Sequence, residues 1–130
     1  MAPSELLASM SIEPLEMYVD GRGTLYKAFP HAVGGEVYLI SIEPGLARGH
    51  HFHAERGEWF VGIQGNPILV VADPATAERR VFPLAGRRVW VPAGLAHAIF
   101  APPDEACLVA AAMQLPHHPD DVFRHRLEAP

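Results

Sequence analysis

The fold of this 130-residue chain is decided by one stretch, Gly45-Leu-Ala-Arg-Gly-His-His51-Phe-His53-Ala-Glu-Arg-Gly-Glu58-Trp-Phe-Val-Gly-Ile-Gln-Gly65. On a β-strand alternate side chains share one face, so His51 and His53 project to the same side with Phe52 opposite. Glu58 stands at an odd offset from His53, and a turn through residues 54–57 is needed to bring its carboxylate back to that face. The stretch predicts a strand, a turn and a second strand whose polar side chains converge.

A second stretch supplies a third imidazole. It reads Gly86-Arg-Arg-Val-Trp-Val-Pro92-Ala-Gly94-Leu-Ala-His97, and its Pro-Ala-Gly bend can deliver His97 from a neighbouring strand. Three neutral nitrogens and one carboxylate suit one divalent transition metal (Zn, Mn, Fe, Ni, Co or Cu) and leave one or two positions for water or substrate. The sequence therefore predicts a metal site made of His51, His53, Glu58 and His97. His50 and His53 form an alternative pair, which strand alternation disfavours.

The rest of the chain has the rhythm of an all-β protein. Thirteen prolines and eleven glycines cut it into short runs rich in Val, Ile, Tyr, Phe and Trp. The predicted strands are Leu15–Val19, Leu25–Phe29, Glu36–Ile42, Trp59–Ile63, Ile68–Ala72, Arg80–Phe82, Val89–Val91, Ala98–Phe100 and Cys107–Ala112. About nine strands of this length predict a sandwich or a closed barrel.

Turns and chain ends complete the expectation. Gly65-Asn66-Pro67 and Ala85-Gly86 predict hairpin or near-hairpin connections, with antiparallel pairing of the strands they join. Residues 119–127 begin with acids and end with cations, which suits the dipole of a short C-terminal helix. Residues 1–14 read as an N-terminal arm, in which residues 4–10 form either one helical turn or a flexible segment. The whole chain, 1–130, reads as one domain.

Composition excludes several classes of partner. The formal net charge is −5, and the basic pairs Arg79-Arg80 and Arg87-Arg88 read as solvated strand ends, so no surface for nucleic acid is expected. No apolar stretch approaches the ~20 residues that span a membrane, and the first residues lack the basic region of a secretion signal. Cys107 stands alone in an apolar run, which fits a reducing compartment. We expect a cytoplasmic protein.

The two stretches match both cupin motifs, Gly-x5-His-x-His-x4-Glu-x6-Gly and Gly-x5-Pro-x-Gly-x2-His. Only the Asn that often closes the second motif is missing, with Ala101 in its place. The resemblance implies a single-domain cupin, a double-stranded β-helix or jelly-roll-like barrel, with a metal-binding core at about residues 36–113. Cupins include isomerases, epimerases, dioxygenases, decarboxylases, storage proteins and transcriptional sensors.

A narrower resemblance lies partly outside the motifs. Asp20-Gly-Arg22-Gly23, the run 44–49, the run 91–97 and His118-Pro-Asp-Asp-Val-Phe123 are similar to the cupin domain of capsular-polysaccharide biosynthesis proteins. The dTDP-4-dehydrorhamnose epimerases are more distant relatives. The resemblance implies an epimerase or ketoisomerase of a nucleotide-activated keto-sugar. It also implies that Arg48 and Arg22 lie near the nucleotide diphosphate, a role that guanidinium forks suit.

The resemblance leaves the acid and the base open. His51 matches the catalytic base of the rhamnose epimerases, but their tyrosine acid falls at about Ala110 here. A histidine that holds a metal has no free lone pair for a proton, so the two roles of His51 exclude each other. His51 is therefore the base only in a metal-free site. If a metal is bound, the candidates for moving the proton are Glu55, His50 and Tyr38.

Two other functions share the same residues. A small iron or manganese dioxygenase would use the same three histidines and glutamate with open positions for oxygen. A non-enzymatic ligand-binding or sensor cupin would need a separate partner chain. Small single-domain cupins commonly pair through strand edges, so the resemblance also implies a homodimer. The loop histidines His31, His117 and His118 are expected to be solvated.

Overall fold

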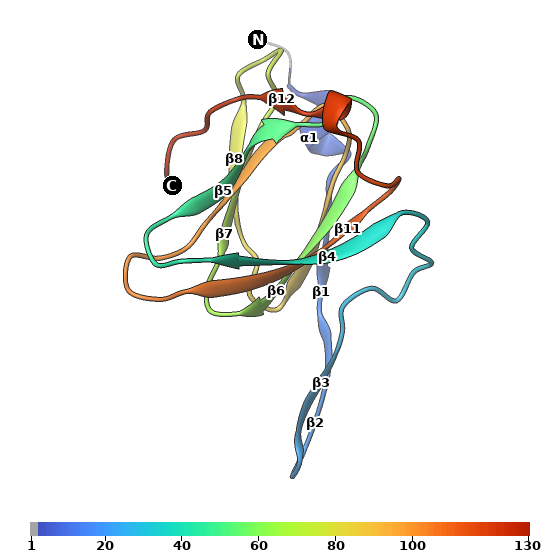
Figure 1. Ribbon diagram of the computed structural model, residues 1–130, viewed down its shortest axis with the longest axis vertical. Helices are drawn as coiled ribbons and strands as arrows, with labels where there is room; N and C mark the ends of the chain where they lie inside the picture. Colours follow the sequence, from blue (N-terminus) through green and yellow to red (C-terminus); the bar gives the residue numbers. More distant parts are fainter. Residues whose placement is uncertain (1–2) are drawn as a thin grey trace.

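The computed structural model describes residues 3–130 and shows two five-stranded sheets that face each other and close into a barrel (Figure 1). The first sheet has the order β1 (Ser11–Pro14), β9 (Arg87–Val91), β6 (Glu58–Gln64), β11 (Cys107–Met113) and β4 (Glu36–Ile42). The second has the order β12 (Phe123–Arg124), β5 (Ala47–Phe52), β10 (Ala96–Phe100), β7 (Ile68–Ala72) and β8 (Arg79–Pro83). All pairings between these strands are antiparallel.

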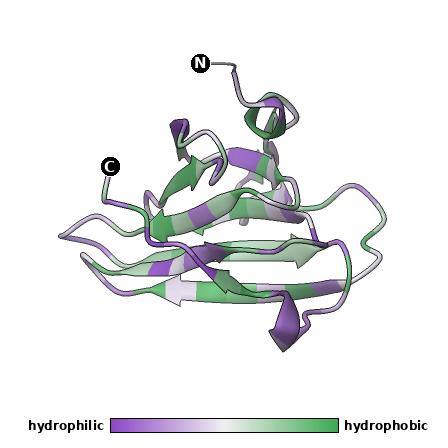
Figure 2. Cartoon of the chain, turned by 90° about the horizontal axis from the view of Figure 1, so that it is seen from above, coloured by the Kyte–Doolittle hydropathy of each residue, from purple (hydrophilic) through white to green (hydrophobic). Residues whose placement is uncertain are grey.

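The core lies between the two sheets. Inward-facing side chains such as Phe60, Leu69, Val89 and Ile99 are at most 2% exposed. Figure 2 shows apolar residues in stretches along the strands of the barrel. Removing such side chains from water is the main favourable term in folding. The expected all-β, jelly-roll-like barrel is confirmed.

The nine predicted strands are all present, with ends shifted by up to two residues. Strands β1 and β12 were not predicted, and the histidine-bearing β5 was expected only from the alternation of His51 and His53. Strands β1 and β12 have only four and two residues, and β5 has the sequence Ala-Arg-Gly-His-His-Phe, with no β-branched residue. Backbone pairing with β10 holds β5 in the sheet instead.

Both predicted hairpins are wrong. Gly65-Asn66-Pro67 leads from β6 to β7, and Ala85-Gly86 leads from β8 to β9, yet each pair of strands lies in opposite sheets. The reason is that β6 is already flanked by β9 and β11, so it has no free edge for β7. These turns are corners of the barrel. The true hairpins are β7–β8 and β2–β3 (Glu16–Asp20 and Gly23–Lys27).

The β2–β3 hairpin projects away from the barrel (Figure 1). Residues of both its faces are exposed. Arg88, by contrast, is only 2% exposed, so its expected place in a solvated strand end is wrong. It makes an ion pair with Glu13 at 2.7 Å and donates to the carbonyls of Lys27 and Ala28. This arginine ties β1 and the end of the hairpin to β9.

The chain ends pack against the barrel. Helix α1 (Glu5–Ala8) is capped by Ser4, whose hydroxyl donates to Asp73 at 2.6 Å, and Leu7 is buried. At the other end, the expected helix over 119–127 is confined to one 3-10 turn, η1 (Pro119–Asp121). The chain then runs extended because β12 pairs with β5. Over residues 3–130 no helix is long and apolar enough to cross a membrane.

Candidate functional site

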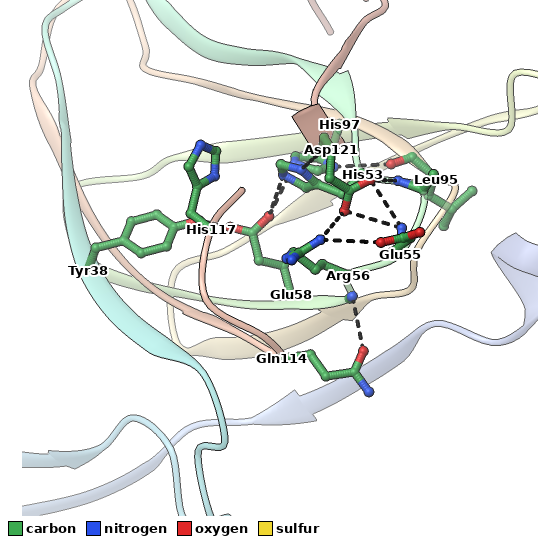
Figure 3. Close-up of polar contacts among 12 residues, drawn as sticks. Tyr38, His53, Glu55, Arg56, Glu58, Leu95, His97, Gln114, His117 and Asp121 are labelled. Atoms are coloured by element: carbon green, nitrogen blue, oxygen red, sulfur yellow. Dashed lines mark hydrogen bonds and ion pairs between the residues drawn. The ribbon is translucent and has the colours of Figure 1, made fainter. Parts of the chain in front are cut away.

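A pocket of about 470 Å³ opens into the barrel between the two sheets. It contains three histidines, His51, His53 and His97, which each offer a ring nitrogen within 4.8 Å of the other two. His51 lies near the end of β5, His53 follows directly after that strand, and His97 comes from the neighbouring strand β10. Glu58, at the start of β6, reaches the same point from the opposite sheet. The four residues predicted from spacing are therefore brought together, and Figure 3 shows three of them, His53, Glu58 and His97.

Two of the imidazoles are fixed by backbone carbonyls. His53 Nδ1 donates to the carbonyl oxygen of Asp121 at 2.7 Å, and His97 Nδ1 donates to that of Leu95 at 3.1 Å. A carbonyl only accepts, so both rings carry their proton on Nδ1 and present Nε2 to the pocket. These Nε2 atoms lie 3.3 Å and 3.5 Å from Glu58 Oε1.

Glu58 is a buried carboxylate, with 2% of its surface exposed. Its Oε2 accepts a hydrogen bond from the Tyr38 hydroxyl. Burial pushes the pKa of Glu58 up, but the adjacent rings of His53 and His97 and the Tyr38 hydroxyl outweigh it and lower the pKa below its usual range. Burial, and then the charge of Glu58, raise the pKa of Tyr38. Glu58 is thus ionised and Tyr38 keeps its proton.

His51 is the least constrained of the three histidines and is only partly buried. Burial lowers its pKa to about 4, and the neighbouring His97 and His53 act in the same direction. Its ring is therefore neutral near pH 7 and has a lone pair to offer to a metal or to a proton.

A β-bulge at His50 sets which side chains face this pocket. His97 pairs with His51 and Ala98 pairs with Gly49, so His50 has no counterpart. It takes a left-handed conformation with φ 58°. The extra residue breaks the alternation, so Arg48 and His51 both line the pocket despite their odd spacing.

The three other proton-transfer candidates separate clearly. His50 lies outside the pocket, where its Nδ1 accepts from the backbone N–H of Leu127. Glu55 is also outside, with a side chain that is 78% exposed. Only Tyr38 lines the pocket.

The two arginines implied by resemblance occupy different places. Arg48 lines the pocket, and its Nε donates to the carbonyl of Ser41 on β4 at 3.0 Å. Arg22 lies in the turn of the β2–β3 hairpin, where its exposed side chain pairs with Asp20 at 2.6 Å. Arg22 is therefore outside the pocket of its own chain.

Position 110, where the resemblance implied a tyrosine, faces away from the pocket. Ala110 packs with Leu15 and Val61 in a cluster apart from the main core, whereas the next residue, Ala111, belongs to that core. A tyrosine at 110 would not reach the pocket. Tyr38 pairs with Ala111 across the β4–β11 ladder and does reach it.

Three further residues near the site were missed by sequence reasoning. His117, expected to be a solvated loop histidine, lines the pocket with its ring 6.3 Å from that of His53. Asp121 is buried and makes an ion pair with Arg56 at 2.8 Å. No local pattern marks these residues, because their contacts join segments about 65 positions apart.

The residues present fit a divalent metal. Donor atoms that share one metal at about 2.1 Å lie roughly 3 to 3.5 Å apart. The distances from Glu58 Oε1 to the two imidazole Nε2 atoms, 3.3 Å and 3.5 Å, fall in this range. Glu58 Oε1 and His97 Nε2 are also buried without a hydrogen-bond partner in residues 3–130, which is rare for such groups.

Comparison with known proteins places the chain in a family. The family model described as "Polysaccharide biosynthesis C-terminal domain" matches residues 18–121. The chain belongs to this family. No curated protein matches the sequence.

Solved structures share the fold of this polysaccharide biosynthesis C-terminal domain. A dTDP sugar isomerase from Desulfovibrio desulfuricans has a TM-score of 0.84 at 18% identity, covering 94% of this chain and 87% of that one. The 3'-monoepimerase ChmJ from Streptomyces bikiniensis has a TM-score of 0.81 at 18% identity, covering 95% and 72%. The sugar 3,4-ketoisomerase QdtA from Thermoanaerobacterium thermosaccharolyticum has a TM-score of 0.78 at 16% identity, covering 92% and 90%.

Proposed function

We propose that this protein is an epimerase or ketoisomerase of a nucleotide-linked keto-sugar in polysaccharide biosynthesis, acting in the cytoplasm. The observation that carries the proposal is one pocket lined by neutral His51, protonated Tyr38 and Arg48. Solved structures of the same fold include an isomerase and an epimerase for dTDP-sugars and a sugar ketoisomerase.

The two reactions share a first half. A base removes the proton from the carbon beside the ketone, which gives an enediol or enediolate, and an acid then returns a proton. Epimerisation returns the proton to the opposite face of the same carbon, and ketoisomerisation returns it to the former carbonyl carbon. Both need a base, an acid and stabilisation of developing negative charge.

The two parts of the substrate, the keto-sugar and the diphosphate, would bind in different parts of the pocket. Its volume of about 470 Å³ lies in the usual range for small-molecule sites. The keto-sugar would enter toward the histidines, and Arg48 would bind the diphosphate through its guanidinium group.

A divalent transition metal, if bound, would be held by His51, His53, His97 and Glu58. Such an ion would supply Lewis-acid stabilisation of the negative charge that develops on the sugar oxygen. His51 is then unable to take a proton, and Tyr38, the one of the three earlier candidates that faces the substrate, is protonated and would serve as the acid that returns one. In a metal-free pocket His51 would take the proton and Tyr38 would return one.

The proposal is tested by proton exchange. The purified protein is incubated in D₂O with a panel of nucleotide-linked 4-keto-6-deoxysugars, and the sugar is followed by NMR and mass spectrometry. We expect deuterium beside the ketone with the wild-type protein and a large loss of exchange with His51→Asn. Absence of exchange across the whole panel would refute the proposal.

A small dioxygenase remains a second candidate because three histidines and a glutamate gather at one point. Anaerobic purification followed by metal analysis separates the two functions. Useful occupancy by iron or manganese together with substrate-dependent oxygen uptake would favour the dioxygenase. Exchange of deuterium without oxygen uptake would favour the isomerase.

We also propose that the protein is a homodimer. The projecting β2–β3 hairpin exposes Met17, Val19 and Leu25 by more than half of their surface, and two-stranded hairpins are marginally stable alone in water. Edge strand β4 exposes Leu39 by 67% beside the pocket. A second copy that covered both surfaces would bring its hairpin, with Arg22, toward the pocket rim. A monomeric mass by light scattering would refute this.

A further inference from the structure

The C-terminal segment 114–121 is anchored across the turn that joins His53 to Glu58. Asp121 Oδ1 accepts from the backbone N–H of Ala54 at 2.7 Å, and Asp121 Oδ2 accepts from Arg56 Nη1 at 2.8 Å. Arg56 Nε donates to the carbonyl of Pro116 at 2.8 Å. One arginine and one aspartate therefore fasten the segment to the turn (Figure 3).

This anchor is buried in an otherwise exposed segment. Residues 114–120 are all exposed, whereas Asp121 has 6% of its surface exposed and the Arg56 side chain 11%. A second tie lies at the start of the segment, where Gln114 and Gly57 exchange hydrogen bonds at 2.9 Å and 3.2 Å. Few apolar contacts hold the segment, so its position depends on these polar bonds.

The same aspartate carries the carbonyl that orients His53. Its backbone oxygen accepts the Nδ1 proton of that ring at 2.7 Å. A neutral imidazole has two tautomers of similar energy, and an acceptor fixed at Nδ1 selects the one whose Nε2 lone pair is free. His97 differs, because its acceptor is Leu95, two residues away on the same segment. Only His53 relies on a remote part of the chain.

We infer that Arg56 and Asp121 are positioning residues of the site, which hold the Asp121 carbonyl against His53 so that this ring keeps Nε2 directed into the pocket. Neither side chain lines the pocket, so both act through His53. The sequence distance between Arg56 and Asp121 makes the C-terminal segment a structural part of the site. The activity measurement below rests on the proposed function, whereas the tautomer measurement does not.

The decisive variant is Asp121→Ala in the full chain, with histidine labelled by ¹⁵N. In the wild-type protein at pH 8.5, NMR should show His53 protonated on Nδ1. In Asp121→Ala we expect a mixture of tautomers for His53 and no change for His97, which serves as an internal reference. Because outer-shell partners of ligating histidines typically contribute 10- to 100-fold, we expect kcat to fall by about that factor with little change in KM.

Control variants separate positioning from general loosening of the C-terminus. Arg79→Ala removes another arginine that donates to the C-terminal backbone, at Glu128, and should change neither the His53 signal nor kcat. Arg56→Ala should disturb the His53 tautomer and lower kcat, and Arg56→Lys should restore much of both. If Asp121→Ala does not fold, Asp121→Asn keeps an oxygen acceptor for Ala54 and replaces the oxygen that accepts from Arg56 with an amide donor, which removes the ion pair. A folded Asp121 variant with an unchanged His53 tautomer would overturn the inference, and an altered tautomer without sugar exchange would refute only the proposed function.

Discussion

Replacing Tyr38 by phenylalanine tests the chemistry of the pocket most directly. The variant removes one hydroxyl, which donates to Glu58 Oε2, and leaves the ring in place. Glu58 then loses its phenol donor while its other oxygen already has no hydrogen-bond partner in the described chain. A hydrogen bond to a charged group contributes about 1.5–3 kcal/mol, so we expect the free energy of unfolding to fall by about that amount. If Tyr38 also transfers a proton, turnover should fall by about 10²- to 10⁴-fold.

The assay is deuterium exchange into the keto-sugar, together with urea unfolding. Burial, and then Glu58, raise the pKa of Tyr38 above its ordinary value, so the phenol stays protonated throughout the working range. The ratio of wild-type to variant rate should therefore be the same at pH 6.5 and pH 9. Tyr26→Phe, the same change on the exposed hairpin, is the matched control and should leave exchange unaltered. A Tyr38→Phe rate within threefold of wild type would refute a role for the phenol in proton transfer.

Three further predictions concern the site and its frame. Glu58→Gln should weaken binding of Zn²⁺ or Mn²⁺ at least about tenfold, measured by equilibrium dialysis and metal analysis. Gly49→Ala should lower the free energy of unfolding by about 1–3 kcal/mol, because φ is +110° at this position and an added Cβ would lie 2.7 Å from the carbonyl oxygen of His97. Gly21→Ala is the control, since a Cβ at Gly21 would have no heavy atom within 4 Å. Arg88→Ala should cost about 2–3 kcal/mol in urea unfolding by leaving partly buried acceptors unpaired, whereas the exposed Arg87→Ala should cost little.

Local periodicity was enough to predict most of the strands and the convergence of the four proposed metal ligands. Alternation on one strand places His51 and His53 on one face, and the four-residue turn before Glu58 brings the carboxylate back. These relations depend on backbone geometry over a few residues, which the sequence encodes directly. The bend before His97 acts in the same local way.

Features that depend on distant contacts escaped this reasoning. The bulge at His50 arises from pairing of β5 with β10 and lets Arg48 face the pocket. Asp121 reads as one of two acids at a helix start, yet its carboxylate is fixed by Arg56. The turn after β6 was predicted to be a hairpin because its sequence carries no information about which strand has an unpaired edge. Strand β6 is flanked by β9 and β11, so β7 joins the other sheet.

The order of strands in the first sheet explains how Tyr38 on β4 can stand in for a tyrosine on β11. Strand β4 lies beside β11, and neighbouring strands are about 4.8 Å apart. A phenol on the inner face of β4 can therefore reach the volume that a phenol on the inner face of β11 would occupy. Tyr38 is opposite Ala111, whose small side chain leaves that volume free. Because β4 is also the edge of its sheet, the proposed acid and the proposed dimer contact lie on the same strand.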